Sequence, residues 1–486
     1  MRRTTRRGAA WNEEEGHEGV EYQKVTSQIL AELKAILDAE NVLVDPDTLA
    51  RYARDEAPSP RDVRPEVVVK PRTTAQVSQI LQVANAHRIP VTFRGQGTGL
   101  SHGAVPTQGG ILLSFEAMNR ILEIDEDNLV AVVEPGVVLL QLRQELERRG
   151  LFYPADPGET SSAIGGNVNT NAGGMNGVKY GNTRGYVLGL EVVLASGEVV
   201  TLGGKTVKRS TGYELMHLII GSEGTLAAVT KILLRLIKRP LHFITLYIPF
   251  QSLHDAIQAV PDILRKKVTP TAIEYIERDS LLLVEHHLEK TMPHHDAAAY
   301  LIIRIDGDTE DELYTIGEAV SDICMEHHAF DVLIASTQDE QDRIWDIRGR
   351  FYEVIVNNHV VQMIDTVVPP SAIATYMDDV KAIAQQWGVR VFSVGHAGDG
   401  NVHLMLLKDD LSDDAWTAKW PPMMKQLYAT AVAYGGTISG EHGIGVDKKP
   451  YLPLSLSATE IGLMKAIKRL FDPHAILNPG KIFDLT

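Results

Sequence analysis

The sequence predicts an α+β protein with two main domains, and three observations support this. The 486 residues are enough for two or three domains. Between residues 65 and 239, short helical and strand-like patterns alternate with glycine-rich loops. After Pro240 glycine becomes scarce, and longer helical stretches alternate with strands. We therefore place a domain boundary near Pro240.

Composition and charge exclude several classes of protein. Hydrophobic residues make up 44% of the chain and charged residues 23%, as in ordinary globular proteins. The 63 acidic and 47 basic residues give a formal charge of −16, which argues against binding to nucleic acid or directly to an anionic membrane surface. Cys324 is the single cysteine, so the chain alone forms no disulfide, thiolate zinc site or iron–sulfur cluster. No apolar run approaches the roughly 20 residues that a membrane-spanning helix needs.

The N-terminal region is predicted to be a tail followed by a helix. Residues 1–18 begin with an arginine-rich stretch and then become acidic, without the apolar core of a secretory signal. We expect a disordered tail here, and an arginine-rich transit peptide is the less favoured alternative. Over residues 20–57 apolar side chains recur at helical spacing, for example at Ile29, Leu33 and Leu37. This pattern predicts helix up to the prolines that follow.

Short elements then alternate along the first domain. Thr73 and Gln76 fit a capping box that opens a helix, and Gly150 is a natural stop for a charged helix over 138–149. Ser196-Gly197 joins two strand-like runs as a hairpin. The predicted strands cover residues 89–93, 111–115, 121–125, 129–133, 190–194 and 199–202. In the second domain the clearest elements are helices over 253–266 and 309–325 and a strand over 300–305.

Glycine-rich loops predict a site for an extended anionic ligand. Residues 94–101 (RGQGTGLS) follow a strand, and their alternate glycines let several backbone N–H groups approach one anion. The spacing is not that of a Rossmann fold, which would need glycine where this chain has Leu100. Residues 157–174 and 221–225 again combine glycine with small hydrogen-bonding side chains. Each loop alone is more simply a tight turn, but the three together favour a long ligand with a diphosphate.

Residues 65–239 resemble the FAD-binding domain of the vanillyl-alcohol oxidase and p-cresol methylhydroxylase superfamily. The motifs that carry the resemblance are RGQGTGLSHGA, DPGETSSAIGGNVNTNAGG and IIGSEGTLAAVT. The resemblance implies a p-cresol methylhydroxylase-type fold, with the first two loops around the diphosphate and flavin of FAD. It implies FAD contacts from Arg94, Gly95, Gly97, Thr98, Gly99, Ser101, Pro157, Thr160, Gly165, Asn167, Gly174 and Glu223.

The FAD is expected to be bound without a covalent link. Some members of the superfamily attach FAD through a histidine in the first loop, near the position that Thr98 holds here. His102 lies where close relatives have glycine, and we expect it at the surface or lining the pocket.

Two histidines in the second domain predict a metal site. Residues 391–407 (VFSVGHAGDGNVHLMLL) contain two apolar runs joined by Asp399-Gly400, a strong two-residue hairpin turn. With that turn His396 would lie directly opposite His403, with their Cβ atoms about 4.5–5.5 Å apart. Two imidazoles at this spacing suit a divalent metal. The alternative is one buried and one exposed histidine with no ligand.

The stretch 440–445 (GEHGIG) offers the remaining groups. Glu441 would complete a His-His-Glu set that leaves positions open for substrate. His442 would point elsewhere and stay free as a base, because the ordinary pKa of histidine, about 6.5, suits proton transfer near neutrality. A simple glycine-rich turn is the alternative.

The motifs HAGDGNVH, SGEHGIG and FDPHAILNPGKIF resemble the FAD-linked 2-hydroxy-acid dehydrogenases, such as the glycolate oxidase D subunit, D-lactate dehydrogenases and D-2-hydroxyglutarate dehydrogenase. The resemblance covers residues 40–483 and implies a C-terminal α+β domain of the FAD-linked oxidase type. It implies one divalent ion, of zinc, manganese or iron. The implied metal ligands are His396, His403 and Glu441.

The same resemblance implies the catalytic roles. His442 would take the proton of the substrate hydroxyl while hydride passes from C2 to FAD, giving a 2-oxo acid. Arg348, in the motif Trp345-x-x-Arg348, would clamp the substrate carboxylate with its planar fork. An arginine on a helix surface beside Asp342 or Asp346 is the alternative.

The resemblance also divides the chain. It implies a FAD-binding domain over 19–239 with its core at 61–239, a substrate and metal domain over 240–450, and a C-terminal segment over 451–486 that returns to the FAD domain. Asn478 of that segment would lie toward the flavin.

One departure bears on the substrate. The hydroxyglutarate branch places a threonine and a lysine near the distal carboxylate, and the matching positions here are Tyr352 and Met363. Neither supplies a cation, so we expect a small monocarboxylate, D-lactate or glycolate. The electrons must pass to an acceptor outside the chain: an iron–sulfur subunit, an electron-transfer flavoprotein, a quinone or oxygen.

Other functions stay open. They are a D-2-hydroxyglutarate dehydrogenase, an alkyl-ether-lipid synthase that uses flavin as a covalent trap, and an inactive flavin-binding accessory subunit. A homodimer is also left open. We expect a cytoplasmic protein, with attachment to a membrane through a partner as the alternative. The histidine pairs at 286–287, 294–295 and 327–328 are expected to be solvated.

Overall fold

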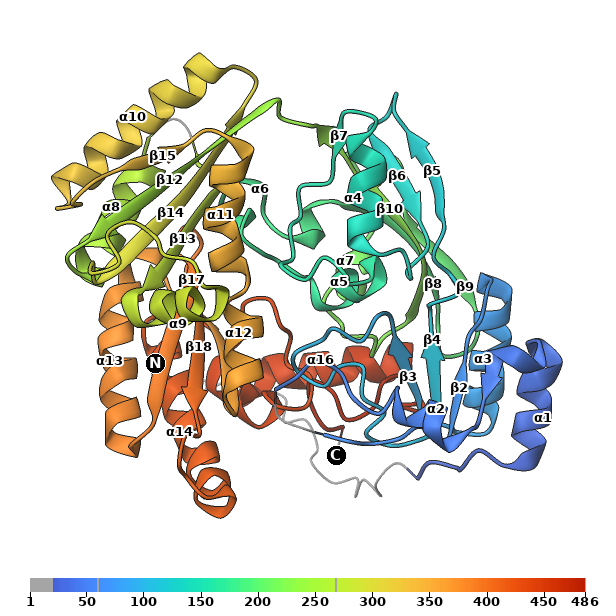
Figure 1. The fold of residues 1–486 in the computed structure, drawn as a ribbon. Coiled ribbons are helices and arrows are strands. Elements are labelled where there is room, and N and C mark those ends of the chain that lie inside the picture. The colour runs from blue at the N-terminus through green and yellow to red at the C-terminus, as the bar shows by residue number, and fades with distance from the viewer. Residues whose placement is uncertain (1–20, 59–60, 267–268, 486) are drawn as a thin grey trace, which may run out of the picture.

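The computed structural model describes residues 21–58, 61–266 and 269–485. The tail predicted over 1–18 lies outside them. The described chain forms two α+β halves that face each other, with a C-terminal helix lying between their lower parts (Figure 1). The predicted fold class is confirmed.

The N-terminal half is built on two sheets. In the first, three parallel strands carry one antiparallel edge strand, and the second is antiparallel throughout. The order in the first sheet is β1 (Val42–Leu43), β2 (Val67–Val69), β4 (Ile111–Ser114) and β3 (Val91–Arg94). The order in the second is β5 (Ile121–Asp125), β6 (Val130–Val133), β10 (Ala228–Arg235), β8 (Val187–Val193) and β9 (Val199–Gly203). A two-stranded ribbon pairs β7 (Leu151–Phe152) with β11 (Ile237–Lys238). All strands predicted for this half are present within a few residues.

Seven helices, several of them short, accompany these sheets in the described residues. They are α1 (Ser27–Ile36), α2 (Pro46–Ala50), α3 (Thr74–Ala86), α4 (Leu139–Glu147), α5 (Ile164–Thr170), α6 (Gly177–Tyr180) and α7 (Leu215–Ile219), with 3₁₀ turns at Ala39–Asn41 and Thr183–Gly185. Thr73 caps α3 by accepting the N–H of Gln76, as predicted, but the capping box is incomplete because Gln76 Oε1 accepts the N–H of Arg72 instead of that of Thr73.

The prediction of continuous helix over residues 20–57 is wrong. The first helix ends at Ile36 because the next residues turn to extended backbone, and β1 then pairs with β2. Asp45 caps a second, five-residue helix that begins at Pro46. Ile29 and Leu33 lie in α1 and Leu37 is its C-cap residue, so the helical spacing ends there, and all three pack in one core with Val42 of β1.

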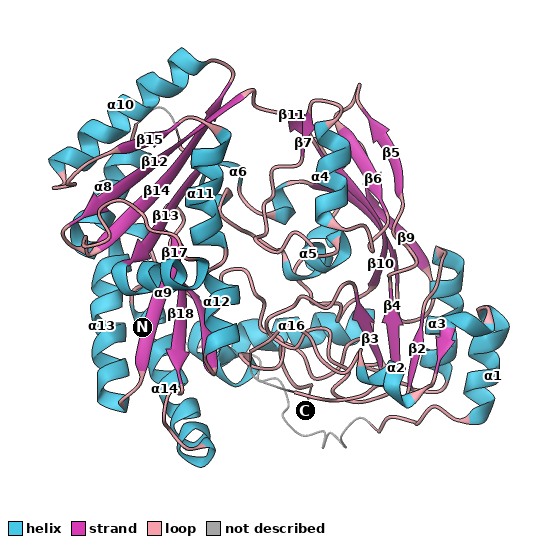
Figure 2. Cartoon of the chain, viewed as in Figure 1, coloured by secondary structure: helices cyan, strands magenta, loops and turns pink. Residues whose placement is uncertain are grey.

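The C-terminal half is built on one antiparallel sheet of seven strands. Their order is β15 (Leu333–Ala335), β12 (His242–Phe250), β14 (Ala299–Gly307), β13 (Ala272–Glu277), β17 (Arg390–His396), β18 (Asn401–Leu407) and β16 (Val361–Val367). The helices are α8 (Leu253–Leu264), α9 (Arg278–Leu288), α10 (Glu310–Glu326), α11 (Gln338–Gly349), α12 (Phe351–Asn358), α13 (Ile373–Trp387) and α14 (Asp413–Ala433), with a 3₁₀ turn at Pro370–Ala372. Figure 2 shows helices on both sides of this sheet.

The two faces of the seven-stranded sheet differ in chemistry. Alternate residues point to opposite faces of a strand. One face is apolar and packs against α8, α10, α13 and α14. The opposite face packs partly against α9, α11 and α12, and it carries polar side chains on three central strands and one edge strand: Glu274, His396, His403 and Asp365. A functional site is therefore expected on the side of the sheet that faces the N-terminal half, where these buried polar groups lie.

The hairpin of β17 and β18 differs from its predicted register. The turn has four residues, 397–400, and His396 pairs with Asn401 while His403 pairs with Val394. The two histidines are therefore diagonal neighbours on one face, and their predicted direct opposition is wrong. The Asp399-Gly400 signal indicated a tighter turn, but the N–H of Gly400 bonds back to the carbonyl of His396.

The last residues run from the C-terminal half back to the first sheet. After a 3₁₀ turn at Lys449–Tyr451 and α15 (Leu452–Ser455), α16 (Ala458–Phe471) lies between the lower parts of the two halves (Figure 1). Leu477 bridges to Val91 of β3, and the backbone N–H of Asn478 donates to the carbonyl of Val91. Among the described helices, none combines the length and the apolar character needed to cross a membrane.

Candidate active site

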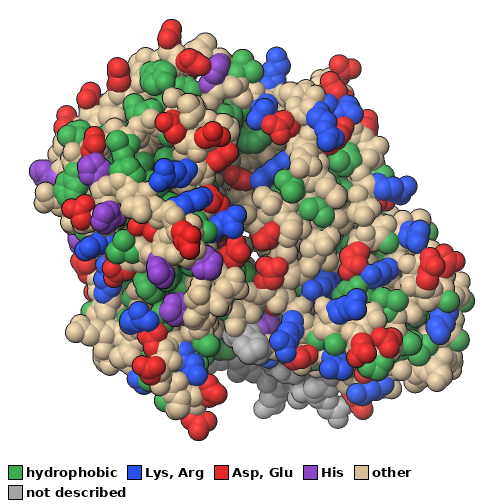
Figure 3. Space-filling view, in the orientation of Figure 1, with side chains coloured by type: hydrophobic (Ala, Val, Ile, Leu, Met, Phe, Trp, Pro, Cys, Tyr) green, Lys and Arg blue, Asp and Glu red, His purple; other side chains and the backbone are tan. Residues whose placement is uncertain are grey.

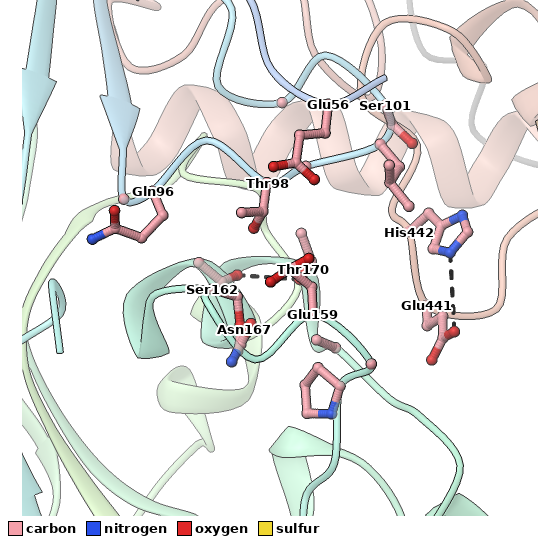
Figure 4. A pocket seen from close by; sticks show the side chains of 18 of the residues that line it. Glu56, Gln96, Thr98, Ser101, Glu159, Ser162, Asn167, Thr170, Glu441 and His442 are labelled. Carbon is pink, nitrogen blue, oxygen red and sulfur yellow. Dashed lines mark hydrogen bonds and ion pairs between the residues drawn. The ribbon is translucent and has the colours of Figure 1, made fainter. Parts of the chain in front are cut away.

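A cleft between the two halves brings the predicted site residues together. It has a volume of about 430 Å³, within the range of cofactor and small-ligand sites. Figure 3 shows the surface hollowed between the halves. In Figure 4, Gln96, Thr98 and Ser101 of the first glycine loop lie opposite Ser162 and Asn167, and Glu441 and His442 lie at one side.

Nearly all of the residues predicted to contact FAD line this cleft. The lining includes Arg94, Gly95, Gly97, Thr98, Gly99, Ser101, Pro157, Gly165, Asn167, Gly174, Glu223 and Asn478. Thr160 is not among them, and its carbonyl instead accepts the N–H of Leu140 at the start of α4.

Unpaired polar atoms in the cleft fit a polar cofactor. Ser162 Oγ, Asn167 Nδ2, Asn169 Oδ1 and Asn478 Oδ1 are buried and have no hydrogen-bond partner among the described residues. All four residues line the cleft. Buried polar groups are nearly always paired in native proteins, so a ligand with several donors and acceptors, such as FAD, suits this surface. Ser162 and Asn169 were missed by the sequence prediction, although they lie within its second motif.

Two of the predicted FAD residues use their side chains elsewhere. Arg94 Nη1 donates to the carbonyl of Arg54 at 2.7 Å. The carboxylate of Glu223 accepts the N–H groups of Ile444 and Gly445, each at 2.7 Å. These bonds leave backbone atoms for contact with a ligand, and they tie the glycine loop at 221–225 to the loop that follows His442.

His102 lines a pocket, one of the two predicted positions, but a different pocket from this cleft. It is 2% exposed, so it is not at the surface, and it does not line the cleft. Its Nδ1 lies 2.8 Å from Asp447, and the ring borders a separate cavity of about 820 Å³. The histidine pairs at 286–287, 294–295 and 327–328 are at the surface except His327, which is half-buried beside Asp262.

Three of the predicted ligands form a compact triangle. His396 Nε2 and His403 Nε2 lie 3.3 Å apart, and Glu441 Oε1 lies 3.4 Å from the first and 3.3 Å from the second. Ligands at about 2.0–2.2 Å from a tetrahedral metal lie about 3.3–3.6 Å from one another. The donor spacing therefore fits one divalent ion. The two imidazoles hold the pKa of Glu441 below its ordinary range although burial opposes this.

Glu274 supports one ligand of this triangle and was missed by the sequence prediction. Its buried carboxylate lies 2.7 Å from His396 Nδ1, which directs His396 Nε2 toward the triangle. Burial disfavours the charged carboxylate, but His396 and Arg348 outweigh burial and lower the pKa of Glu274. The available signal was an acidic residue inside the apolar strand AIEYIE. His403 Nδ1 has no such partner among the described residues.

Arg348 is buried in the cleft and not on a helix surface. It projects from α11, and its Nη2 lies 2.6 Å from Glu274 Oε2. Nη2 is therefore ion-paired with Glu274, whereas Nε is buried and has no hydrogen-bond partner among the described residues. A buried guanidinium with an unpaired N–H at a cleft wall is suited to bind a carboxylate.

His442 lies beside the triangle without belonging to it. Its Nε2 is 3.9 Å from Glu441 Oε1, and its Nδ1 is 3.7 Å from Asp365 Oδ2. Burial lowers the pKa of His442 to about 4, against the opposing charge of Asp365. The imidazole is therefore neutral near pH 7 and able to accept a proton.

Comparison with known proteins identifies the family and the fold of this chain. Residues 65–203 match the FAD binding domain family, and residues 239–482 match the family of FAD linked oxidases, C-terminal domain. The D-lactate dehydrogenase of Anaerostipes hadrus is 40% identical, over 95% of this chain and 98% of that protein. The glycolate oxidase subunit GlcD of Bacillus subtilis is 39% identical, over 89% of this chain and 92% of that protein. The crystal structure of p-cresol methylhydroxylase shares the fold with a TM-score of 0.78 at 20% identity, over 94% of this chain and 96% of that one.

Proposed function

Because this chain belongs to the family of FAD-linked oxidases, we propose that it oxidises a small 2-hydroxy acid to the 2-oxo acid, with FAD as the hydride acceptor. The relatives named above are a D-lactate dehydrogenase and a glycolate oxidase subunit, which share this class of substrate in their names. The observation that carries the proposal is the meeting of Arg348, His442 and the triangle of His396, His403 and Glu441 in the cleft that the FAD loops line.

Each of these residues has a task in that reaction. Arg348, which Glu274 holds in place through Nη2, binds the substrate carboxylate with its remaining guanidinium donors, Nε among them. The triangle His396, His403 and Glu441 would hold one divalent ion, of zinc, manganese or iron, which when bound lowers the pKa of a hydroxyl ligand. His442, neutral and uninvolved in the triangle, accepts the hydroxyl proton at Nε2. The cleft walls align C2 with the isoalloxazine that FAD supplies when bound.

The charges of the cleft favour a monocarboxylate over a dicarboxylate. Among the described residues that line the cleft, the basic side chains are those of Arg94 and Arg348. Arg94 Nη1 already donates a hydrogen bond to the backbone carbonyl of Arg54. Carboxylates are more numerous in the lining: Glu56, Glu159, Glu223, Glu353 and Glu441. Tyr352 and Met363 line the cleft, where the hydroxyglutarate branch has threonine and lysine. A second carboxylate would lack a cation here, so D-lactate or glycolate is favoured over D-2-hydroxyglutarate.

An anaerobic screen of the flavin absorbance tests the proposed function. FAD-loaded protein is mixed with D-lactate, L-lactate, glycolate and D-2-hydroxyglutarate, and the loss of the visible absorbance of the flavin is followed. We expect D-lactate or glycolate to bleach the flavin fastest. Fastest bleaching by D-2-hydroxyglutarate would contradict the charge argument. No bleaching by any of the four would favour an accessory subunit or an alkyl-ether-lipid synthase instead.

Metal content provides a separate test of the triangle. His403→Ala should lose the divalent ion and substrate-dependent bleaching while keeping FAD, because its ring nitrogen is one corner of the triangle. His295→Ala removes the same side chain at an exposed position and should change neither. Elemental analysis and the flavin spectrum measure both. Full turnover of the parent protein after exhaustive chelation, with no ion detected, would refute the metal role.

Reduced FAD needs an acceptor from outside the chain. Cys324 is the single cysteine and is buried, so the chain has no set of thiolates for an iron–sulfur cluster. The acceptor is then an iron–sulfur subunit, an electron-transfer flavoprotein, a quinone or oxygen. Reoxidation rates with each class, measured after substrate reduction, distinguish them. We propose a cytoplasmic protein whose contact with a membrane, if any, is through such a partner.

A further inference from the structure

Asp365 is a completely buried carboxylate at the end of β16 whose role is not covered by the reaction described above. It pairs with His403 across the sheet, so its side chain lies on the same face as the metal triangle. Its Oδ2 accepts the backbone N–H groups of Gly440, Glu441 and His442 at 3.0, 3.1 and 3.0 Å. Three successive residues of one turn thus donate to a single oxygen.

Two side chains complete the surroundings of this oxygen. Lys448 Nζ and Ser439 Oγ each lie 3.1 Å from Asp365 Oδ2, and Asn401 Nδ2 donates to Asp365 Oδ1 at 2.7 Å. Burial disfavours the charged carboxylate, but the Lys448 ammonium and the three backbone N–H groups stabilise it. The carboxylate is therefore an anion surrounded by donors.

These donors decide between two sets of residues that could hold a metal. Asp365, His403 and His442 form one such set, and His396, His403 and Glu441 form the other. A cation at Asp365 Oδ2 would meet the positive ends of three N–H groups and an ammonium. Glu441 Oε1 instead faces two imidazole nitrogens. The second set is electrostatically suited to a cation, and Asp365 is suited to hold the turn.

The turn at 440–442 needs the contact with Asp365 because the side chains of the adjacent residues Glu441 and His442 must point to different partners. Glu441 reaches the triangle, while the His442 ring lies 5.2 Å from the His403 ring, centre to centre. Gly440 brings the backbone close enough: a Cβ there would lie 2.9 Å from Asp365 Oδ1 and 2.4 Å from Asn401 Nδ2. The close approach of the turn to Asp365 therefore depends on glycine at position 440 as well as on the carboxylate at position 365.

We propose that Asp365 is the positioning residue of the site: one buried carboxylate fixes the backbone of 440–442 so that Glu441 is delivered to the metal and His442 to the substrate proton. This inference rests on the proposed metal triangle. Outer partners of metal ligands are worth about 10–100-fold in metal affinity or activity when removed. Asp365 acts through the backbone of its neighbours and touches neither substrate nor ion.

The test compares Asp365→Asn with Asp472→Asn. In the first variant an amide replaces one oxygen, so a donor faces either the N–H groups of the turn or Asn401 Nδ2. Asp472 is a matched control, since it is also fully buried and accepts Lys468 Nζ and the N–H groups of Ile476 and Leu477. Metal affinity by chelator competition, FAD content, thermal midpoint and anaerobic flavin reduction are measured on folded, FAD-loaded protein.

We expect Asp365→Asn to keep FAD, to weaken metal affinity about 10–100-fold and to slow flavin reduction by a similar factor. The substrate concentration at half-maximal rate should change by less than about threefold, because Arg348 is untouched. Asp472→Asn should lower the thermal midpoint and leave metal affinity unchanged. If Asp365→Asn lowers only the midpoint, with parental metal affinity and reduction rate, the residue is merely structural and the inference fails.

Two further outcomes separate this inference from the proposed function. A parent protein that binds no divalent ion refutes the triangle, and parental flavin reduction by Asp365→Asn then refutes the positioning of His442 as well. If Asp365→Asn does not fold, Gly440→Ala tests the same contact, since its Cβ forces the turn away from Asp365 and Asn401. The same loss of metal affinity with FAD retained is expected, and unchanged affinity in that variant overturns the inference.

Discussion

Glu441 and His442 are chain neighbours whose surroundings give them opposite properties. The imidazoles of His396 and His403 stabilise Glu441 as an anion, whereas burial keeps His442 neutral. An anionic ligand and a neutral base are the protonation states that metal binding and proton abstraction need. The assignment of roles at this scale therefore depends on local environment and not on residue type alone.

Replacement of His442 separates proton removal from metal binding. His442→Asn should keep FAD and the divalent ion, because its nitrogens lie 3.7 Å or more from their nearest carboxylates and outside the triangle. Flavin reduction should slow about 10²–10⁴-fold, the usual contribution of a positioned base. Since burial lowers the pKa of His442 to about 4, protonation of His442 should reduce the parental rate only as the pH falls toward that value. Loss of the ion in this variant would reverse the roles of Glu441 and His442.

Replacement of Arg348 separates substrate binding from chemistry. Arg348→Lys keeps a positive charge beside Glu274 but loses the planar fork. We expect the half-saturating concentration of the hydroxy acid to rise clearly more than the limiting rate of flavin reduction falls. Steady-state and stopped-flow kinetics give the two quantities. A change confined to the limiting rate would place the substrate carboxylate elsewhere in the cleft.

At the scale of elements, the positions of strands and helices along the chain could be predicted from the sequence more accurately than the register in which the strands pair. The motif from His396 to His403 contains both ligands, and period-2 alternation puts them on one face in either register. The turn length depends on contacts such as that of Gly400 with the chain near Val368, which local sequence does not reveal. Glu274 and Asp365 could not be assigned for the same reason, because their partners lie far away in the chain.

The turn between β17 and β18 can be tested by a pair of glycine replacements. Gly400 has φ +88°, and a Cβ there would lie 1.9 Å from the carbonyl oxygen of Val368. Gly400→Ala should therefore lower the free energy of unfolding by more than about 1 kcal/mol and weaken metal binding. Gly462 lies in α16 with open space around it, and Gly462→Ala should raise the free energy of unfolding by roughly 0.5–1 kcal/mol. Denaturant unfolding measures the free energy of unfolding of both variants. Equal changes in the two would contradict the argument that the backbone at position 400 requires glycine.

At the scale of the whole molecule, neither half contains the site alone. The N-terminal half supplies the glycine loops, the C-terminal half supplies Arg348 and the triangle, and Asn478 returns from the C-terminal end. Nδ2 of Asn478 donates to the carbonyls of Gly103 and Glu223, so the returning segment is tied to the chain just after the first glycine loop and to the loop at 221–225. The family resemblance predicted this division, whereas composition alone indicated only the boundary near Pro240.

The acidic chain also has to attract an anionic substrate. Its formal charge is −16, and carboxylates outnumber guanidinium groups along the cleft. A divalent ion at the triangle and Arg348 would supply the compensating positive charge where the substrate carboxylate and hydroxyl bind. Such an ion would contribute to substrate binding as well as to the acidity of the hydroxyl.

The attachment of FAD gives a prediction for the molecule as a whole. Thr98 holds the position of the linking histidine in some relatives, and His102 is buried against Asp447 and outside the cleft lining. Denaturation should therefore release the yellow cofactor into the supernatant. Because non-covalent FAD binds the folded state, excess FAD at about 100 times its dissociation constant should stabilise that state by about 2.7 kcal/mol and raise the thermal midpoint. Flavin that stays with the precipitated polypeptide would show a covalent link, and a midpoint indifferent to added FAD would contradict binding in this cleft.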